Sequence, residues 1–267
     1  MPKTSRMDHN KVKAFYEAQV AEYPHWPAIL NVHSWLTADF RVYEEWRTLL
    51  NLVPLSENMR ILELGCGGGR WIERFSPFVK EAVGVDFSAN AIQCARKRAE
   101  AKGIRNATYV LASITDYEPK GFFDLVYYSA VLLYLDDMEV INNITRYARY
   151  LSPHGFFLVR DSVANQTHSL DHVGYSAVYR FIDQWEMFFQ TMGFQLRIRR
   201  KAQPSLLYPR FWDSRPTNRV YRLLKRLNLS KALFLLMERF LCNKNIATTP
   251  QREDAYVHSH DFMIFDR

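Results

Sequence analysis

A glycine-dense turn between two apolar segments constrains the fold of this chain more than any other feature. Residues 60–64 read Arg-Ile-Leu-Glu-Leu, residues 65–69 read Gly-Cys-Gly-Gly-Gly, and apolar residues recur at helical spacing over 71–75. The pattern predicts a strand, a tight turn and a helix. Its glycines allow positive φ angles and a close approach of the backbone to a ligand, to which the helix that follows offers unpaired N–H groups.

An acidic residue follows at the spacing that a nucleotide-binding α/β fold requires. The next apolar run, 81–86, ends in Asp86, 21 residues after Gly65, where such folds place the carboxylate that binds a ribose diol. In the dinucleotide fingerprint the last glycine would fall on Arg70, whose side chain would obstruct the packing of the helix on the strand. The spacing therefore favours a ligand with a single nucleoside over NAD.

Further segments, in the same order along the chain, extend the pattern to a family. Residues 63–69 and 86–88 resemble the first two motifs of the class I S-adenosylmethionine-dependent methyltransferases, 123–132 resemble their fourth strand, and 151–160 resemble a turn and their fifth strand. The likeness covers 55–200. It implies an α/β fold with a doubly wound, mostly parallel seven-stranded sheet whose last strand is antiparallel. It also implies S-adenosylmethionine as the cofactor and S-adenosylhomocysteine as its product.

The same resemblance implies which residues hold the cofactor. Ser113 departs from the family, which often has an acid there to accept a hydrogen bond from the adenine amino group, although a serine oxygen can also accept one. Tyr16 or Tyr23 is expected near the methionine end. The full expected set is Tyr23, Gly65, Cys66, Gly67, Asp86, Phe87, Ser88, Ser113, Ile114 and Ser129.

Candidate catalytic residues follow the fifth strand. Since the methyl group of a sulfonium is electrophilic, an enzyme has mainly to position the nucleophile, but a hydroxyl acceptor also needs a general base. Asp161 and His172 are the predicted bases, with His168 a further candidate, because the carboxyl end of a strand is where substrate meets cofactor. The sequence predicts a polar loop around the histidines and an aromatic helix over 179–189.

Composition limits the other classes of protein and site. With 48% hydrophobic and 15% aromatic residues the chain can bury a large core, and its three widely spaced cysteines indicate neither a disulfide framework nor a metal site. Because no apolar leader or membrane-spanning run is present, we expect a cytoplasmic protein. Of the net charge of +7, residues 193–231 carry +10 and the rest −3, so nucleic acid is disfavoured as a general partner.

Two additions to the core are expected. We expect residues 1–54 to form a helical N-terminal cap and residues 55–200 and 257–267 to form the core. Residues 201–256 are expected to form a basic helical insertion between the last two strands. The stripe formed by Val220, Leu223, Leu224 and Leu227 requires burial against something. The favoured interpretation is a lid over the acceptor site, with Arg210, Arg215 or Arg219 free to pair with an anionic acceptor. Contact with an anionic membrane and self-association are the alternatives.

Three functions remain at this point. The favoured one is transfer of a methyl group to a small-molecule or glycan acceptor, with oxygen as the favoured acceptor atom. Residues 160–162 and 176–180 support it, because they resemble segments of methyltransferases of polysaccharide assembly. The alternative is an RNA or protein methyltransferase, acting on N-terminal amines in the protein case, that docks through the basic insertion. A scaffold that binds the cofactor without catalysis is the third.

Overall fold

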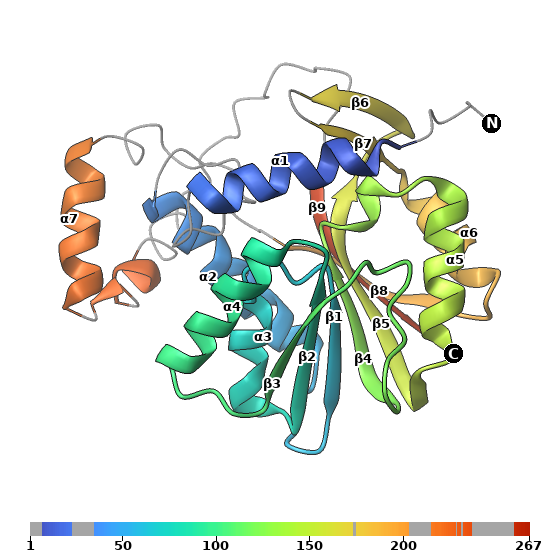
Figure 1. Ribbon diagram of the computed structural model, residues 1–267, viewed down its shortest axis with the longest axis horizontal. Coiled ribbons are helices and arrows are strands. Elements are labelled where there is room, and N and C mark those ends of the chain that lie inside the picture. The colour runs from blue at the N-terminus through green and yellow to red at the C-terminus, as the bar shows by residue number, and fades with distance from the viewer. Residues whose placement is uncertain are drawn as a thin grey trace. The chain divides into compact units, whose positions relative to one another are not determined.

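The structure is a computed structural model that describes residues 7–22, 35–172, 175–202, 215–227, 229–230, 232–236 and 259–267. The chain divides into two compact units (Figure 1). The first contains residues 1–29, 54–200 and 258–267, and the second contains 30–53 and 201–257. Residues 1–54, expected to form one cap, are thus divided between the two units.

A seven-stranded sheet forms the centre of the first unit. Its order is β3 (Ala107–Leu111), β2 (Glu81–Asp86), β1 (Arg60–Leu64), β4 (Phe123–Ser129), β5 (Leu151–Val163), β9 (Ser259–Asp266) and β8 (Gln195–Lys201). The first five strands are parallel, and β9 is antiparallel to β5. The predicted doubly wound sheet with an antiparallel last strand is confirmed.

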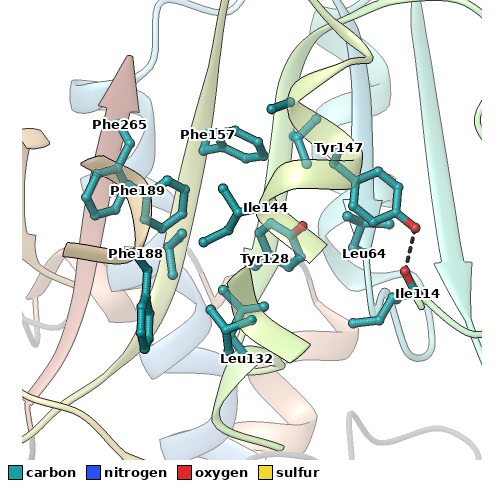
Figure 2. Packing of buried hydrophobic residues seen from close by; sticks show 14 of the residues in the cluster. Leu64, Ile114, Tyr128, Leu132, Ile144, Tyr147, Phe157, Phe188, Phe189 and Phe265 are labelled. Carbon is teal, nitrogen blue, oxygen red and sulfur yellow. Dashed lines mark hydrogen bonds between the residues drawn. The ribbon is translucent and has the colours of Figure 1, made fainter. Parts of the chain in front are cut away.

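Alternating apolar residues bury both faces of this sheet, as in other parallel sheets. On one face, α5 (Asp137–Ala148) and α6 (Ile182–Gln190) cover the core shown in Figure 2, where Phe189 stacks on Phe265 with ring centroids 3.8 Å apart. On the other face, Trp71 of α3 (Arg70–Phe75) packs edge-on against Tyr127. α4 (Ala89–Ala101) packs against β3 and β2.

Side chains at the helix starts fix two of these helices. The Ser88 hydroxyl accepts a hydrogen bond from the Ala91 N–H at 3.1 Å, which makes Ser88 the expected N-cap of α4. Asp136 and Glu139 form a reciprocal capping box at the start of α5. The acidic pair at 136–137 therefore marks a helix start.

The segment 168–179 differs from the predicted loop. It forms an antiparallel hairpin of β6 (His168–His172) and β7 (Tyr175–Tyr179). Arg180 then continues in extended conformation and bridges to Val163, so α6 begins at Ile182 and not at residue 179. Tyr175, Ala177 and Val178 of β7 are buried, so this strand packs against the rest of the unit.

The second unit contains α2 (Trp35–Leu52), α7 (Arg215–Arg226) and a short helical stretch over 232–236. The buried cluster in this unit consists of Leu36, Phe40, Tyr221 and Phe234. The stripe that was expected to be buried is not covered by the described residues, since Val220, Leu223 and Leu227 are exposed. Tyr221 is buried instead, and its hydroxyl donates to the Asp39 carboxylate at 2.7 Å.

Candidate functional site

The glycine turn after β1 needs glycine for steric reasons that the structure makes specific. The Gly65 and Cys66 N–H groups donate to the Val85 carbonyl, which brings the turn against the end of β2. Gly65 has a φ of 75°, and a Cβ added there would run into the Val131 side chain. Gly69 has a φ of 74°, and a Cβ there would lie 2.7 Å from Cε1 of Tyr109.

Asp86 joins this turn to the start of α4. One carboxylate oxygen accepts from the Gly67 N–H at 2.7 Å and the other accepts from the Ser88 N–H at 2.9 Å. Burial raises the pKa of Asp86, and these two N–H groups oppose the rise. Each oxygen keeps a lone pair for a ligand. The carboxylate is thus positioned to accept hydrogen bonds from neighbouring hydroxyls of a ribose.

A cavity of about 320 Å³ opens where β1, β2 and β4 end. Ligands of parallel α/β sheets bind at this edge. The cavity brings together most of the residues that the sequence predicted for the cofactor. These are Gly65, Gly67, Asp86, Phe87, Ser88, Ser113, Ile114 and Ser129.

Among the described residues, Cys66 is the predicted cofactor residue outside this lining. The Cys66 side chain is buried against Gly84, where an added Cβ would meet its Sγ at 2.8 Å, and burial raises the pKa of the thiol. Cys66 therefore packs the turn onto β2. Tyr23 lies outside the described residues.

The hydroxyl groups in the lining already have protein partners. Ser129 accepts from the Trp71 indole N–H at 3.1 Å. The Ser113 hydroxyl lies 2.7 Å from that of Thr115 and also accepts from the Thr115 N–H. Because the Thr115 hydroxyl donates to Asp116, the Ser113 hydroxyl donates to Thr115 and keeps one lone pair for the adenine contact expected of it.

One face of α1 (His9–Glu22) lines the cavity opposite the strand ends, and Figure 1 shows this helix above them. His9, Val12, Tyr16 and Val20 follow one another on this face at spacings of three or four residues. Asn10 and Lys13, next to His9 and Val12 in the chain, also line the cavity. Two polar contacts fasten the helix. His9 bonds Glu139 of α5 at 2.6 Å, and Glu17 accepts from the Ala89 N–H at the start of α4 at 3.0 Å.

Aromatic residues gather at the end of the cavity nearest β4. The hydroxyls of Tyr16 and Tyr134 form a hydrogen bond, and Tyr175 packs edge-on against Tyr134 with centroids 5.6 Å apart. Burial raises the pKa of Tyr16 and of Tyr134, so both phenols stay protonated and neutral. This end offers ring faces and neutral hydroxyls to a ligand.

Asp161 lies behind this end and is fully buried, outside the cavity lining. It accepts a hydrogen bond from the Ser162 N–H at 2.7 Å, and the Leu133 N–H lies close enough to favour its charged form, while Oδ2 has no hydrogen-bond partner among the described residues. Burial raises its pKa to about 6, while those N–H groups and the nearby Arg160 and Arg180 oppose the rise. Asp161 thus holds the one-turn helix η3 (Leu132–Tyr134) against β5.

Arg180 holds the same turn from its other side. Its guanidinium donates to the carbonyls of Leu132 and Leu135, at 3.0 and 2.7 Å, and to Asp137. Arg180 and Asp161 therefore determine where Tyr134 stands. His168 and His172 belong to β6, and their side chains lie outside the described residues.

Sequence reasoning named Tyr16 of α1, but it missed the other residues of that helix face and the lining residues that follow Ser129. The four-residue spacing of Val12, Tyr16 and Val20 was a usable signal for the α1 face. The segment that follows the carboxyl end of β4 supplies the lining residues Ala130, Val131, Tyr134 and Leu135. Among the described residues, no group of three or more His, Cys, Asp or Glu side chains could hold a metal ion.

Comparisons with known proteins agree with this geometry. Residues 61–155 match the family described as "Methyltransferase domain". The chain is 30% identical over 129 residues to phosphoethanolamine N-methyltransferase 1 of Triticum aestivum, covering 46% of this chain and 25% of that protein. It is 31% identical over 135 residues to a ubiquinone biosynthesis O-methyltransferase of Bradyrhizobium, covering 49% and 52%.

The fold is shared with solved structures. One is phosphoethanolamine N-methyltransferase 1 of Haemonchus contortus in complex with phosphoethanolamine and S-adenosylhomocysteine. The TM-score is 0.58 at 19% identity, and the alignment covers 72% of this chain and 41% of that chain. The present chain thus spans about a quarter to a half of the length of these curated relatives.

Proposed function

Because the chain belongs to the class I S-adenosylmethionine-dependent methyltransferases, we propose that it transfers the methyl group of S-adenosylmethionine to a small-molecule or glycan acceptor, at oxygen. One observation carries the proposal. The cavity at the strand ends is bordered by the glycine turn and by Asp86, whose carboxylate is held by the Gly67 N–H within the segment that matches the family.

The cofactor would lie along the edge formed by β1 and β2. Asp86 would accept from the ribose hydroxyls, Gly65 and Gly67 would allow the backbone to approach the methionine portion, and Ile114 would pack against the adenine. S-adenosylmethionine supplies an electrophilic methyl group, so the protein's task is to align the acceptor with it.

The size of the site favours a small acceptor, or a small terminal group of a larger one. As the described residues line it, the cavity beneath α1 has a volume of about 320 Å³, which suits a small ligand. The Lys13 ammonium on the α1 face would suit an acceptor with an anionic group, such as a carboxylate or phosphate. This weighs against the RNA or protein alternative.

The source of the general base is a separate part of the proposal. Asp161 is a candidate through its raised pKa of about 6, which lets it take up a proton near neutral pH. Because Asp161 is buried behind Tyr134, it can also act indirectly, by positioning η3. His172 stays a predicted base. A kcat loss in Asp161→Asn with unchanged cofactor affinity would support either of the two Asp161 roles.

Calorimetry with S-adenosylhomocysteine tests the cofactor site. Asp86→Asn keeps one oxygen acceptor but loses the charge, and we expect its affinity to fall at least tenfold, because hydrogen bonds to charged groups contribute about 1.5–3 kcal/mol. Asp183→Asn, at an exposed position on α6, is the matched control and should bind as the wild type does. Tight binding of NAD with no binding of S-adenosylmethionine would overturn the proposal.

A second candidate, transfer to an amine, has its own supporting observation. The rings of Tyr16 and Tyr134 line the cavity, and aromatic faces attract ammonium groups. The wheat relative named above is a phosphoethanolamine N-methyltransferase.

Acceptor screening with S-adenosylmethionine labelled in its methyl group separates the two candidates. One pool contains hydroxylated aromatics, sugars and organic acids, and the other contains phosphorylated and free primary amines. Label in the first pool alone supports transfer to oxygen, and label in the second alone replaces it with transfer to nitrogen. Label in neither pool, from protein that binds S-adenosylhomocysteine, would favour the non-catalytic scaffold.

A further inference from the structure

The second unit presents an apolar helix face that nothing in the methyl-transfer reaction requires. Val220 and Leu223 of α7 and Leu227, which follows its last residue, recur at spacings of three and four residues, and their exposed fractions are 59%, 57% and 58%. Leu229, Leu235 and Leu236 add exposed apolar surface nearby in the chain, at 47%, 55% and 64%.

This face is not the one by which α7 packs in its own unit. Tyr221, which faces inward, stands roughly 100° around the helix from Val220. Its ring stacks on Phe234 with centroids 5.9 Å apart, and its hydroxyl donates to Asp39. Lys225 pairs with the same aspartate. The contacts that hold α7 in place therefore leave the leucine face pointing away from them.

The charge beside the apolar face has a single sign. The helix contains Arg215, Arg219, Arg222, Lys225 and Arg226 and no acid. Arg219, Arg222 and Arg226 are exposed, and among the described residues they form no ion pair. Arg222 and Arg226 lie on the same side of the helix, adjacent to Leu223.

We propose that this α7 face binds peripherally to a membrane surface that contains anionic lipids. An amphipathic helix with exposed leucines on one face and arginines on the next lies in the headgroup region, with the apolar side chains inserted and the guanidinium groups at the phosphates. A nucleic acid would use the arginines but leave the leucines in water. No described helix of the chain is long and apolar enough to cross a membrane, so the contact is made at the surface.

Co-flotation of the full-length protein with vesicles tests the proposal. One vesicle is phosphatidylcholine alone and the other is phosphatidylcholine mixed with phosphatidylserine. The wild type should float with the anionic vesicles and much less with the neutral ones, and added salt should weaken the binding. Each arginine near the surface contributes about a fivefold change in affinity.

Two pairs of variants separate the apolar and the basic contributions. Leu223→Gln with Leu227→Gln should abolish flotation, while Phe122→Gln, at an exposed position of the other unit, should leave it unchanged. Arg222→Gln with Arg226→Gln should weaken anionic binding about 25-fold if the two act independently. Lys97→Gln with Arg105→Gln, both exposed on the other unit, should have no effect. Unchanged thermal midpoints and S-adenosylhomocysteine affinity show that each variant is folded.

Several results would overturn the proposal. One is a wild type that stays in the dense fraction with anionic vesicles. Another is a double leucine variant that floats normally but needs more acceptor for half-maximal turnover, which would make the face part of an acceptor lid. A third is a dimer in sedimentation that the same variant dissociates, and a fourth is binding to single-stranded RNA that the arginine variant weakens while no vesicle binds.

Discussion

The hydroxyl of Tyr16 is hydrogen-bonded to the hydroxyl of Tyr134, so the N-terminal helix is joined to the turn after the fourth strand across the end of the cavity. This bond, the His9–Glu139 pair and the Glu17 contact to α4 together hold α1 over the site. Access for a ligand at this end therefore requires α1 or η3 to move.

A double-mutant cycle measures the coupling between the two tyrosines. Tyr16→Phe, Tyr134→Phe and the double variant should give a coupling energy of about 0.5–1.5 kcal/mol in urea unfolding, because each single change removes the same hydrogen bond. Tyr150→Phe, whose hydroxyl bonds the exposed Glu118, serves as control and should couple to neither. Additive effects of the two changes would show that the hydroxyl pair contributes nothing to closure.

The raised pKa of Asp161 gives stability a defined pH dependence. Its pKa is about 6 when folded, against an ordinary 3.8, so between these values the native protein holds a proton that the unfolded chain has lost. Rising pH through this window therefore destabilises the wild type, by up to about 3 kcal/mol.

Asp161→Asn removes that titration. The difference in unfolding free energy between variant and wild type should shift in favour of the variant as pH rises from about 4 to about 6, and then stay level. Chemical denaturation at a series of pH values measures it. A difference that does not change with pH would mean that Asp161 ionises in the folded protein as it does in water.

Gly69→Ala tests the steric requirement of the turn. The left-handed conformation costs an alanine about 1–2 kcal/mol, and the clash with the Tyr109 ring adds about 1–3 kcal/mol. Gly103→Ala has a similar φ of 66° but open space around the new Cβ, so it should lose only the first contribution. Equal losses of stability in the two variants would show that the Tyr109 contact is unimportant.

Lys13 provides a test of acceptor charge. Lys13→Met should raise KM for an acceptor with a carboxylate or phosphate about tenfold, with little change for a neutral acceptor, because it removes a charged partner from the cavity. Lys11→Met, on the same helix but outside the cavity lining, is the control. A rise in KM that is equal for charged and neutral acceptors would assign Lys13 a packing role.

The parts of the site that depend on nearby residues were predictable from sequence. The glycine turn and the Ser88 cap act through spacings of a few residues, Asp86 follows Gly65 at a fixed spacing of 21 residues, and the strands follow from apolar runs between turns. By contrast, Tyr16 meets Tyr134 across 118 residues of chain, which no local pattern encodes. The position of Asp161 at the strand edge was predictable, but its burial depends on η3 and Arg180 folding over it.

The α7 stripe shows a different limit of sequence reasoning. A helical repeat of apolar residues predicts a face that avoids water, but it does not say what covers that face. Within the second unit α7 packs through the ring and the hydroxyl of Tyr221, and Val220, Leu223 and Leu227 remain exposed. Similarly, the hairpin at 168–179 was missed because its strands mix polar and aromatic residues.

The hydrogen bonding of β8 directly to β9 has a consequence for how such enzymes diversify. Residues 202–258 leave and return at neighbouring strands, and the entropy cost of closing a loop grows only slowly with its length. Segments of very different size can therefore be exchanged at this junction during evolution while the pairing of the sheet is kept. Exchange of this segment by recombination can then change the location of such an enzyme in the cell, while the residues of the catalytic site stay the same.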